Sequence, residues 1–371
     1  MENYRVGVFA DRGMPSLDVM DILNDITEDS EFFRDDENRL VGSGRRGSTL
    51  VEVKLGEIPM DHQGQLELAE AVPAILREYG WDRLIYVTDL PLVAFNRPVV
   101  AQSAVDSDGW VISAPSFGWF GARRRLRKEL ISLIDGNGGV VGTSEPRTAG
   151  RGQDQDSTVR SQVLDTPWRA VQLIAGTARS NRPWRMPRVL TSSLAAMAAS
   201  GGFGVFYGSI WDLAHSMSFT RAVGVGLLSI LSFTMWIILR NRLFVRADEN
   251  RSPWRRNVDN IATFTTIALA ATILYVLVFA VMTVLTAAIV PTDYLASSVS
   301  VPTGWFSYFT IGWLSASLGT FAGAIGSNFD ESAEIVGATY SEREYERRRK
   351  WGQFDDQQDQ DDEDDESKDD N

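Results

Sequence analysis

Asp11 and Asp89 are the two residues whose type and position come nearest to a catalytic site. Each directly follows a short apolar run, at 4–10 and 83–88, that is typical of a buried strand. Ligands of open α/β sheets bind outside the carboxyl ends of the strands, so a carboxylate pair there could hold Mg²⁺ or act as acid and base. Asp is also common where a turn follows a strand. We favour this turn role for both residues and keep catalysis by the pair as an alternative.

The remaining motifs predict no metal site and no cofactor. Residues 42–47 (GSGRRG) match the dinucleotide pattern, but they follow an acidic loop and lead into a strand, which indicates a flexible turn. The only histidines, His62 and His215, fall in segments too far apart to share a metal. The chain has no cysteine, which excludes disulfides and thiolate chemistry. The basic run at 123–127 lacks an aromatic set for stacking, so nucleic acid is not an expected partner.

Residues 1–135 have the pattern of a cytoplasmic α/β domain. Besides the two buried runs, 50–58 alternates like a strand, and 99–104 with 110–114 predict a strand pair. Helical spacing of apolar residues separates these strands. Strands alternating with helices favour a mixed or parallel sheet covered on its faces. Residues 136–158, rich in Gly, Ser and charge, are expected to form a flexible linker.

The rest of the chain is organised by four long apolar runs, at 189–208, 222–239, 261–290 and 304–326. Crossing a bilayer takes about 20 mostly apolar residues, so each run is long enough to span. The sequence therefore predicts an α/β soluble domain followed by an all-α bundle of four transmembrane helices.

Arginine and lysine crowd three flanks of these runs: 179–188, 240–256 and 343–350. The loop after the first run offers only Arg221, and the loop after the third has no Lys or Arg. Basic flanks stay on the cytoplasmic side, and with four spans all three flanks share one side. We therefore expect a multi-pass protein of the inner (plasma) membrane with both termini cytoplasmic. The first residues also lack the basic start and apolar core of a secretory signal.

Small residues and tryptophans suggest how the runs pack and where they end. No run contains Asp, Glu, Lys, Arg or His, which argues against an ion-coupled transporter. Small residues let helix backbones approach closely. The two G-x-x-x-G pairs favour packing inside one bundle over formation of a homo-oligomer; they are Gly204 with Gly208, and Gly319 with Gly323. The predicted membrane-interface anchors are Trp168, Trp184 and Trp254.

Three further segments complete the predicted organisation. Residues 159–188 are expected to form an amphipathic juxtamembrane helix, with packing against the soluble domain as an equal alternative. Residues 327–351 have the pattern of a charged cytoplasmic helix. Residues 352–371 are expected to be a disordered acidic tail, since 355–371 hold eleven acids and one lysine. The net charge of −13 therefore belongs mostly to the tail.

Four stretches carry a resemblance to a known group of proteins: 88–92 (TDLPL), 97–101 (RPVVA), 181–185 (NRPWR) and 340–349 (YSEREYERRR). With them the chain resembles an uncharacterised family of bacterial multi-pass membrane proteins. The resemblance covers most of the chain but not the acidic tail. It implies an α/β domain ahead of a small membrane bundle, with no assigned activity and no functional residues to carry over.

Missing catalytic sets and uncharged spans favour a protein that is not an enzyme. The leading hypothesis is a sensing, scaffold or accessory protein with a cytoplasmic docking domain, whose partners are the lipid bilayer and a cytoplasmic protein. One alternative is a channel or lipid-handling transporter that uses the Gly and Ser faces of the first and fourth runs. The other is a membrane-tethered enzyme with Asp11 and Asp89 at the sheet edge.

Overall fold

The chain folds into two compact units, and each unit is built from segments that are not continuous in the sequence. The first comprises Met1–Ser180, Val245–Ala262 and Tyr340–Asn371, and the second comprises Asn181–Phe244 and Thr263–Thr339. The computed structural model describes residues 4–28, 32–34, 40–44, 47–61, 64–94, 96–104, 107–136, 147–148, 159–164, 166–246, 252–299, 304–351 and 353–354.

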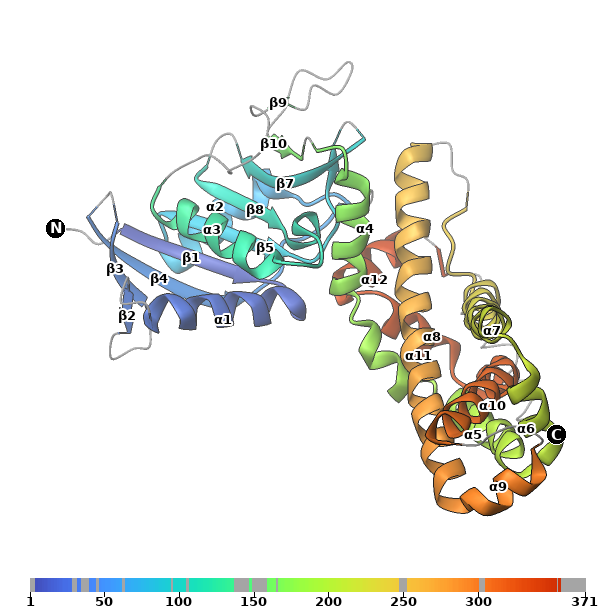
Figure 1. The fold of residues 1–371 in the computed structure, drawn as a ribbon. Helices are drawn as coiled ribbons and strands as arrows, with labels where there is room; N and C mark the ends of the chain where they lie inside the picture. The colour runs from blue at the N-terminus through green and yellow to red at the C-terminus, as the bar shows by residue number, and fades with distance from the viewer. Residues whose placement is uncertain are drawn as a thin grey trace, which may run out of the picture. The chain divides into compact units, whose positions relative to one another are not determined.

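A mixed sheet forms the centre of the first unit (Figure 1). Four parallel strands lie in its middle, in the order β4 (Gly47–Leu55), β1 (Tyr4–Ala10), β5 (Arg83–Thr88) and β8 (Gly109–Ser113). Antiparallel strands extend both edges: β3 (Leu40–Gly44) and β2 (Phe32–Arg34) beside β4, and β7 (Arg97–Ala104), β10 (Val159–Val163) and β9 (Arg147–Thr148) beside β8. A short strand, β6 (Val93–Ala94), pairs with β7.

Helices cover both faces of this sheet because its central strands are apolar on both sides. Val6 and Val8 of β1 belong to one core cluster, which also holds residues of α1 (Met14–Glu28) and α3 (Ala122–Ile134). Phe9 and Tyr86 point the other way, into a cluster with residues of α2 (Leu68–Tyr79). Side chains alternate between the faces of a strand, so a run of continuous apolar residues requires cover on both sides. The predicted α/β domain is confirmed.

The first unit extends beyond residue 135, where the sequence analysis ended it. β10 continues the sheet beyond β7, and its sequence VRSQV is too polar to be recognised as a strand. The segment predicted as a helix over 159–188 thus starts as a strand, and its helical part is α4 (Arg169–Ser180), followed by the 3-10 helix η2 (Pro183–Arg188). α4 packs on the 3-10 helix η1 (Ala114–Phe117), with Gly176 against the Pro115 carbonyl. Most of the predicted linker lies outside the described residues, as does the tail beyond residue 354.

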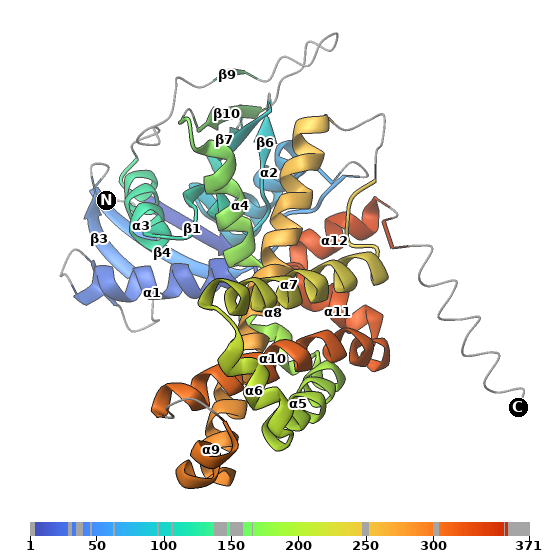
Figure 2. The ribbon, with the colours of Figure 1, turned by 45° about the vertical axis from the view of Figure 1, so that its right-hand side comes forward.

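The second unit is helical (Figure 2). Its elements are α5 (Thr191–Phe206), α6 (Gly208–Ser216), α7 (Phe219–Arg240), α8 (Pro253–Ile289, whose first residues belong to the first unit), α9 (Thr292–Ser298), α10 (Trp305–Gly326), the 3-10 helix η3 (Ser327–Phe329) and α11 (Ser332–Thr339). Among the described residues, three helices are long and apolar enough to cross a membrane: Phe219–Arg240, Pro253–Ile289 and Trp305–Phe329. A fourth span would need two helical pieces together, Arg169–Arg188 and Thr191–Phe206, which are bent by 62°.

Two predicted helices are interrupted in the structure. The first run, 189–208, yields a helix of only 16 residues, and the extended backbone at Tyr207 separates α5 from α6. Glycine, frequent in this run, lowers helix propensity.

The charged segment 327–351, predicted as one helix, is divided into η3, α11 and α12 (Glu342–Lys350). Ser341 caps the new helix α12, because its side chain accepts the backbone N–H of Glu344.

Glycines let α5 and α10 approach closely. A Cβ at Gly204 would collide with Ser315, and one at Gly319 or Gly323 would collide with Met197. Gly208 differs from this predicted set, because it starts α6 after the break and nothing described lies within 4 Å of a Cβ there. Asp330, which follows η3 after the end of α10, connects the same two helices. Its carboxylate accepts hydrogen bonds from the backbone N–H groups of Ser192 and Ser193 at the start of α5.

Substituting Gly204 tests this packing. Gly204→Ala should destabilise the protein by about 1–3 kcal/mol, because the added methyl group meets the Ser315 backbone at 3.0 Å. Gly202→Ala is the matched control on the same helix, where nothing lies within 4 Å, and should be neutral or stabilising by up to about 1 kcal/mol. Thermal unfolding of the full chain in detergent measures both. Equal effects of the two substitutions would contradict the packing.

Candidate functional site

Asp11 and Asp89 lie at the point of the sheet where the chain connections diverge. From β1 the chain passes through α1 to β4 on one side, and from β4 through α2 to β5 on the other side of β1. In open α/β sheets this divergence leaves a crevice at the carboxyl ends of the two strands, where ligands bind. Asp11 directly follows β1 and Asp89 directly follows β5, as the sequence predicts. The structure brings them together, with the Asp89 backbone N–H donating to Asp11 Oδ2 at 3.3 Å.

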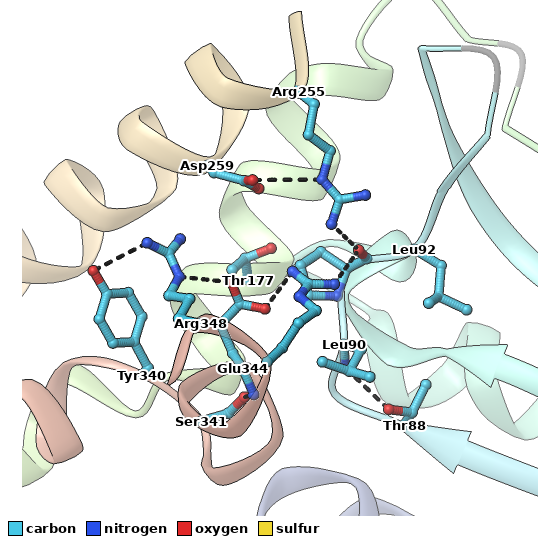
Figure 3. Close-up of polar contacts among 12 residues, drawn as sticks. Thr88, Leu90, Leu92, Thr177, Arg255, Asp259, Tyr340, Ser341, Glu344 and Arg348 are labelled. Atoms are coloured by element: carbon cyan, nitrogen blue, oxygen red, sulfur yellow. Dashed lines mark hydrogen bonds and ion pairs between the residues drawn. The ribbon is translucent and has the colours of Figure 1, made fainter. Parts of the chain in front are cut away.

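The Asp11 carboxylate is fully buried and receives several hydrogen bonds. The Tyr86 hydroxyl donates to Oδ1, and the Thr88 hydroxyl donates to Oδ2 at 2.6 Å. Burial disfavours the charged form and raises the pKa of Asp11 to about 6, although these hydrogen bonds and the nearby Arg343 act in the opposite direction. Thr88 also accepts the backbone N–H of Leu90 at 3.1 Å, which orders the turn after β5 (Figure 3).

Asp89 is buried as well, and one of its oxygens is unsatisfied. The Ser341 side chain hydrogen-bonds to it, but Oδ1 has no partner among the described residues. Burial first, and the neighbouring Asp11 second, raise the pKa of Asp89 well above its ordinary value. Two adjacent carboxylates in a site of low polarity favour sharing a proton.

Helix α12, from the far end of the chain, closes this crevice. Arg343 is buried, with Nε 3.6 Å from Asp11 Oδ1 and Nη1 3.4 Å from Glu57 at the rim. Its other nitrogen, Nη2, donates to the Ile58 carbonyl. Lys350 Nζ donates to the Met60 carbonyl at 2.7 Å. Helix α12 thus contacts Asp11 after β1, and both a side chain and backbone carbonyls of the segment that follows β4.

Helix α12 makes a second set of contacts, with the turn after β5, which Arg255 of α8 also contacts. Glu344 accepts from Arg348 Nε at 2.7 Å (Figure 3). It is also paired with Arg347. Arg347 and Arg255 both donate to the Pro91 carbonyl, at 3.3 and 3.1 Å. Burial lowers the pKa of Arg347 to about 10, which leaves it cationic at neutral pH.

Buried basic and acidic groups gather around α12. The guanidinium groups of Arg255, Arg343, Arg347 and Arg348 lie near the carboxyl groups of Asp11, Asp89, Asp259 and Glu344. Arg343 is also paired with the more exposed Glu57 and Glu346. Buried ion pairs gain little over apolar packing, but removing one partner costs about 3–5 kcal/mol because a buried charge is left uncompensated. The cluster therefore specifies where α12 lies.

Sequence reasoning missed α12 as part of the site. The stretch 340–349 was expected to be a charged cytoplasmic helix, and nothing in a single sequence pairs it with Asp11, which is more than 300 positions earlier. One local signal was available: Ser341 and Glu344 have the S-x-x-E spacing of a helix start. Arg343 and Arg347 are four residues apart and share a helix face.

The other predicted residues do not join this site. Gly44 and Gly47 pair across the β3–β4 hairpin, and residues 45 and 46 lie outside the described part. His62 also lies outside it, and the Nδ1 atom of His215 is 2.8 Å from the Trp211 carbonyl. The residues described include no group of three or more His, Cys, Asp or Glu placed to hold a metal ion.

The three tryptophans proposed as membrane-interface anchors lie near helix starts. Trp168 directly precedes α4 and is 71% exposed, Trp184 lies in η2, and Trp254 is partly buried in the first turn of α8. Their anchoring role stays a prediction.

No protein-family model matches the chain, and neither the curated proteins nor the solved structures include one with significant similarity to it. The arrangement of the site is therefore interpreted from its own chemistry. A buried carboxylate pair with raised pKa values is typical of acid–base sites. Here, however, the pair is contacted by Arg343 and Ser341 of the chain itself.

The raised pKa of Asp11 predicts a specific pH dependence of folding. The folded chain holds the Asp11 proton more tightly than the unfolded chain, so its stabilising effect is complete below about pH 4 and is lost as the pH rises through about 6. The shift corresponds to roughly 3 kcal/mol. Denaturant unfolding of the full chain between pH 4 and 8 should show this component in the wild type and not in Asp11→Asn.

The exposed carboxylate Glu70 provides the control for that experiment. Glu70→Gln should leave the pH profile of the wild type unchanged. An Asp11→Asn profile that parallels the wild type between pH 4 and 6 would show that Asp11 titrates alike in the folded and unfolded chains.

Proposed function

We propose that this chain is a multi-pass protein of the inner (plasma) membrane whose α/β unit is a non-enzymatic docking module, occupied at rest by the chain's own helix α12. The carrying observation is the buried contact of Arg343 with Asp11 at the carboxyl ends of β1 and β5. A protein partner on the cytoplasmic side would act by displacing α12, and sensing would consist of that exchange.

The chemistry of α12 supports docking rather than catalysis. The helix has the sequence EREYERRRK, so burial of its arginines depends on pairing with carboxylates and carbonyls, not on an apolar face. Such an interface is specific in geometry and gains little over water, which suits an exchangeable ligand. A basic helix of a partner could make the same contacts with Asp11, Glu57 and the Pro91 carbonyl.

The order of the two units along the chain supports the proposed topology. The chain leaves the first unit after Ser180 and returns at Val245, then leaves again after Ala262 and returns at Tyr340. If each excursion crosses the bilayer twice, the α/β unit, the segment Val245–Ala262 and α12 share one side. The basic residues at 240–256 and 343–350 favour the cytoplasmic side for these segments.

Removing Arg343 should release α12. In Arg343→Ala, Asp11 loses its cation, and backbone amides over 341–350 should exchange hydrogen at least about a hundredfold faster than in the wild type. Hydrogen exchange of the full chain in detergent, read by mass spectrometry, measures this. Arg349→Ala is the matched control, since Arg349 is exposed on the same helix and should leave exchange unchanged.

The emptied crevice should then accept a ligand from outside. A synthetic peptide with the sequence of residues 340–354 is expected to bind full-length Arg343→Ala, and binding should be lost when Asp11→Asn is added. The wild type should bind it weakly, because its own helix competes. Failure of the peptide to bind any of these chains would contradict the docking proposal.

The proposed topology predicts the accessibility of single cysteines. The chain has no cysteine, so an introduced one is its only thiol. Ser297→Cys, exposed in α9, should react in intact cells with a maleimide that does not cross membranes. Glu70→Cys and Glu342→Cys should react only after permeabilisation. Labelling of Ser297→Cys and Glu342→Cys from the same side would overturn the crossing between them.

A further inference from the structure

A pocket of about 260 Å³ lies within the second unit, between α6, α7, α8 and α10. Aromatic rings make up much of its wall: Phe219, Phe279, Phe306, Phe309 and Trp313. Phe219 and Phe306 are largely exposed, so the pocket opens at their end. Leu314 and Ala214 are buried and form its inner part.

The wall offers an occupant almost no hydrogen bond. Of the residues that line the pocket, Thr310 and Trp313 carry side-chain N–H or O–H groups, and both are engaged. The Thr310 hydroxyl donates to the Ser307 carbonyl at 2.9 Å, and Trp313 Nε1 donates to the Ala222 carbonyl at 2.7 Å. A polar ligand would lose its hydration here without replacement, so the pocket fits an apolar chain.

The pocket extends along the first turns of two helices. Its lining runs from Phe219 to Val225 on α7 and from Phe306 to Leu314 on α10. At 1.5 Å per residue these stretches are ~9 and ~12 Å long, which is less than half of the ~30 Å hydrocarbon core of a bilayer. The pocket therefore fits part of one acyl chain.

A cationic residue belongs to the helix turn at the open end. Arg221 lies in the first turn of α7, between the lining residues Phe219 and Ala222; it does not line the pocket itself, and it is exposed without an ion pair to any described residue. The N-terminus of a 22-residue helix adds a partial positive charge at the same place. An anionic group at this rim and an apolar chain along Phe279 together describe a phospholipid.

The geometry points to a binding slot for one acyl chain of a bilayer phospholipid, with the lipid phosphate at Arg221. This inference rests on the proposed membrane location. The slot differs from ordinary lipid contact because the chain inserts between helices, where it is enclosed by the rings of α8 and α10 rather than lying along an outer face.

Photo-crosslinking of the full chain in phosphatidylcholine vesicles tests the slot. The probe is phosphatidylglycerol with a diazirine in the middle of one acyl chain, and the adducts are located by peptide mass spectrometry. Adducts should concentrate at 219–225, 279 and 306–314. Val223→Phe, which fills the slot, should lower them about tenfold, since displacing two methylene groups from an apolar site weakens binding by roughly that factor.

Leu228→Phe is the matched control on α7, because Leu228 is exposed and does not line the pocket; its adducts should equal those of the wild type. Arg221→Gln, a surface change that leaves the wall intact, should reduce labelling by phosphatidylglycerol to the level of an equivalent phosphatidylcholine probe. Arg240→Gln, at the other end of α7, should preserve the difference. Equal labelling by the two lipids in the wild type would overturn the role of Arg221.

The proposed membrane location and the slot can fail separately. If alkaline carbonate extracts the chain from membranes, the proposed membrane location is wrong, and the proposed slot is wrong with it. A chain that resists extraction but is labelled evenly around α7, with no loss in Val223→Phe, would overturn the slot alone.

Discussion

The first unit depends on polar partners for the carboxyl groups that its own sheet edge buries. Asp11 and Asp89 lie out of contact with water at the ends of β1 and β5, where neither strand supplies a cation. Arg343 of α12 provides the nearest positive charge, and Glu344 in turn holds Arg347 and Arg348 in place. Because a buried charge without a partner costs several kcal/mol, the sheet edge and the terminal helix require each other. The α/β unit is therefore completed by residues that come after all the candidate membrane spans.

Much of the fold follows from local patterns. Strands β1 and β5 were predictable because most of their residues are apolar and an aspartate follows each strand. Helices α7, α8 and α10 were predictable because their apolar runs are long. The position of Asp11 and Asp89 at the carboxyl edge followed from the same strands. What a single sequence does not contain is pairing over long distances. The role of Arg343, and the place of β10 beside β7, depend on such pairing and on short polar segments without a periodic signal.

The helical unit shows a different limit of pattern reasoning. Hydropathy predicted a first span at 189–208, but α5 ends at Phe206, where Tyr207 takes an extended backbone conformation. Gly204 packs against Ser315, while Gly208, part of the same G-x-x-x-G spacing, contacts nothing within 4 Å of its would-be Cβ. Spacing identifies a small face on a continuous helix, but it says nothing about where that helix ends.

The position of α12 also bears on how the protein is made. Ribosomes synthesise Met1–Ser180 first, and α12 follows only after the segments Asn181–Phe244 and Thr263–Thr339. The contacts of Arg343 and Lys350 with the sheet edge can therefore form only after both of those segments have been translated.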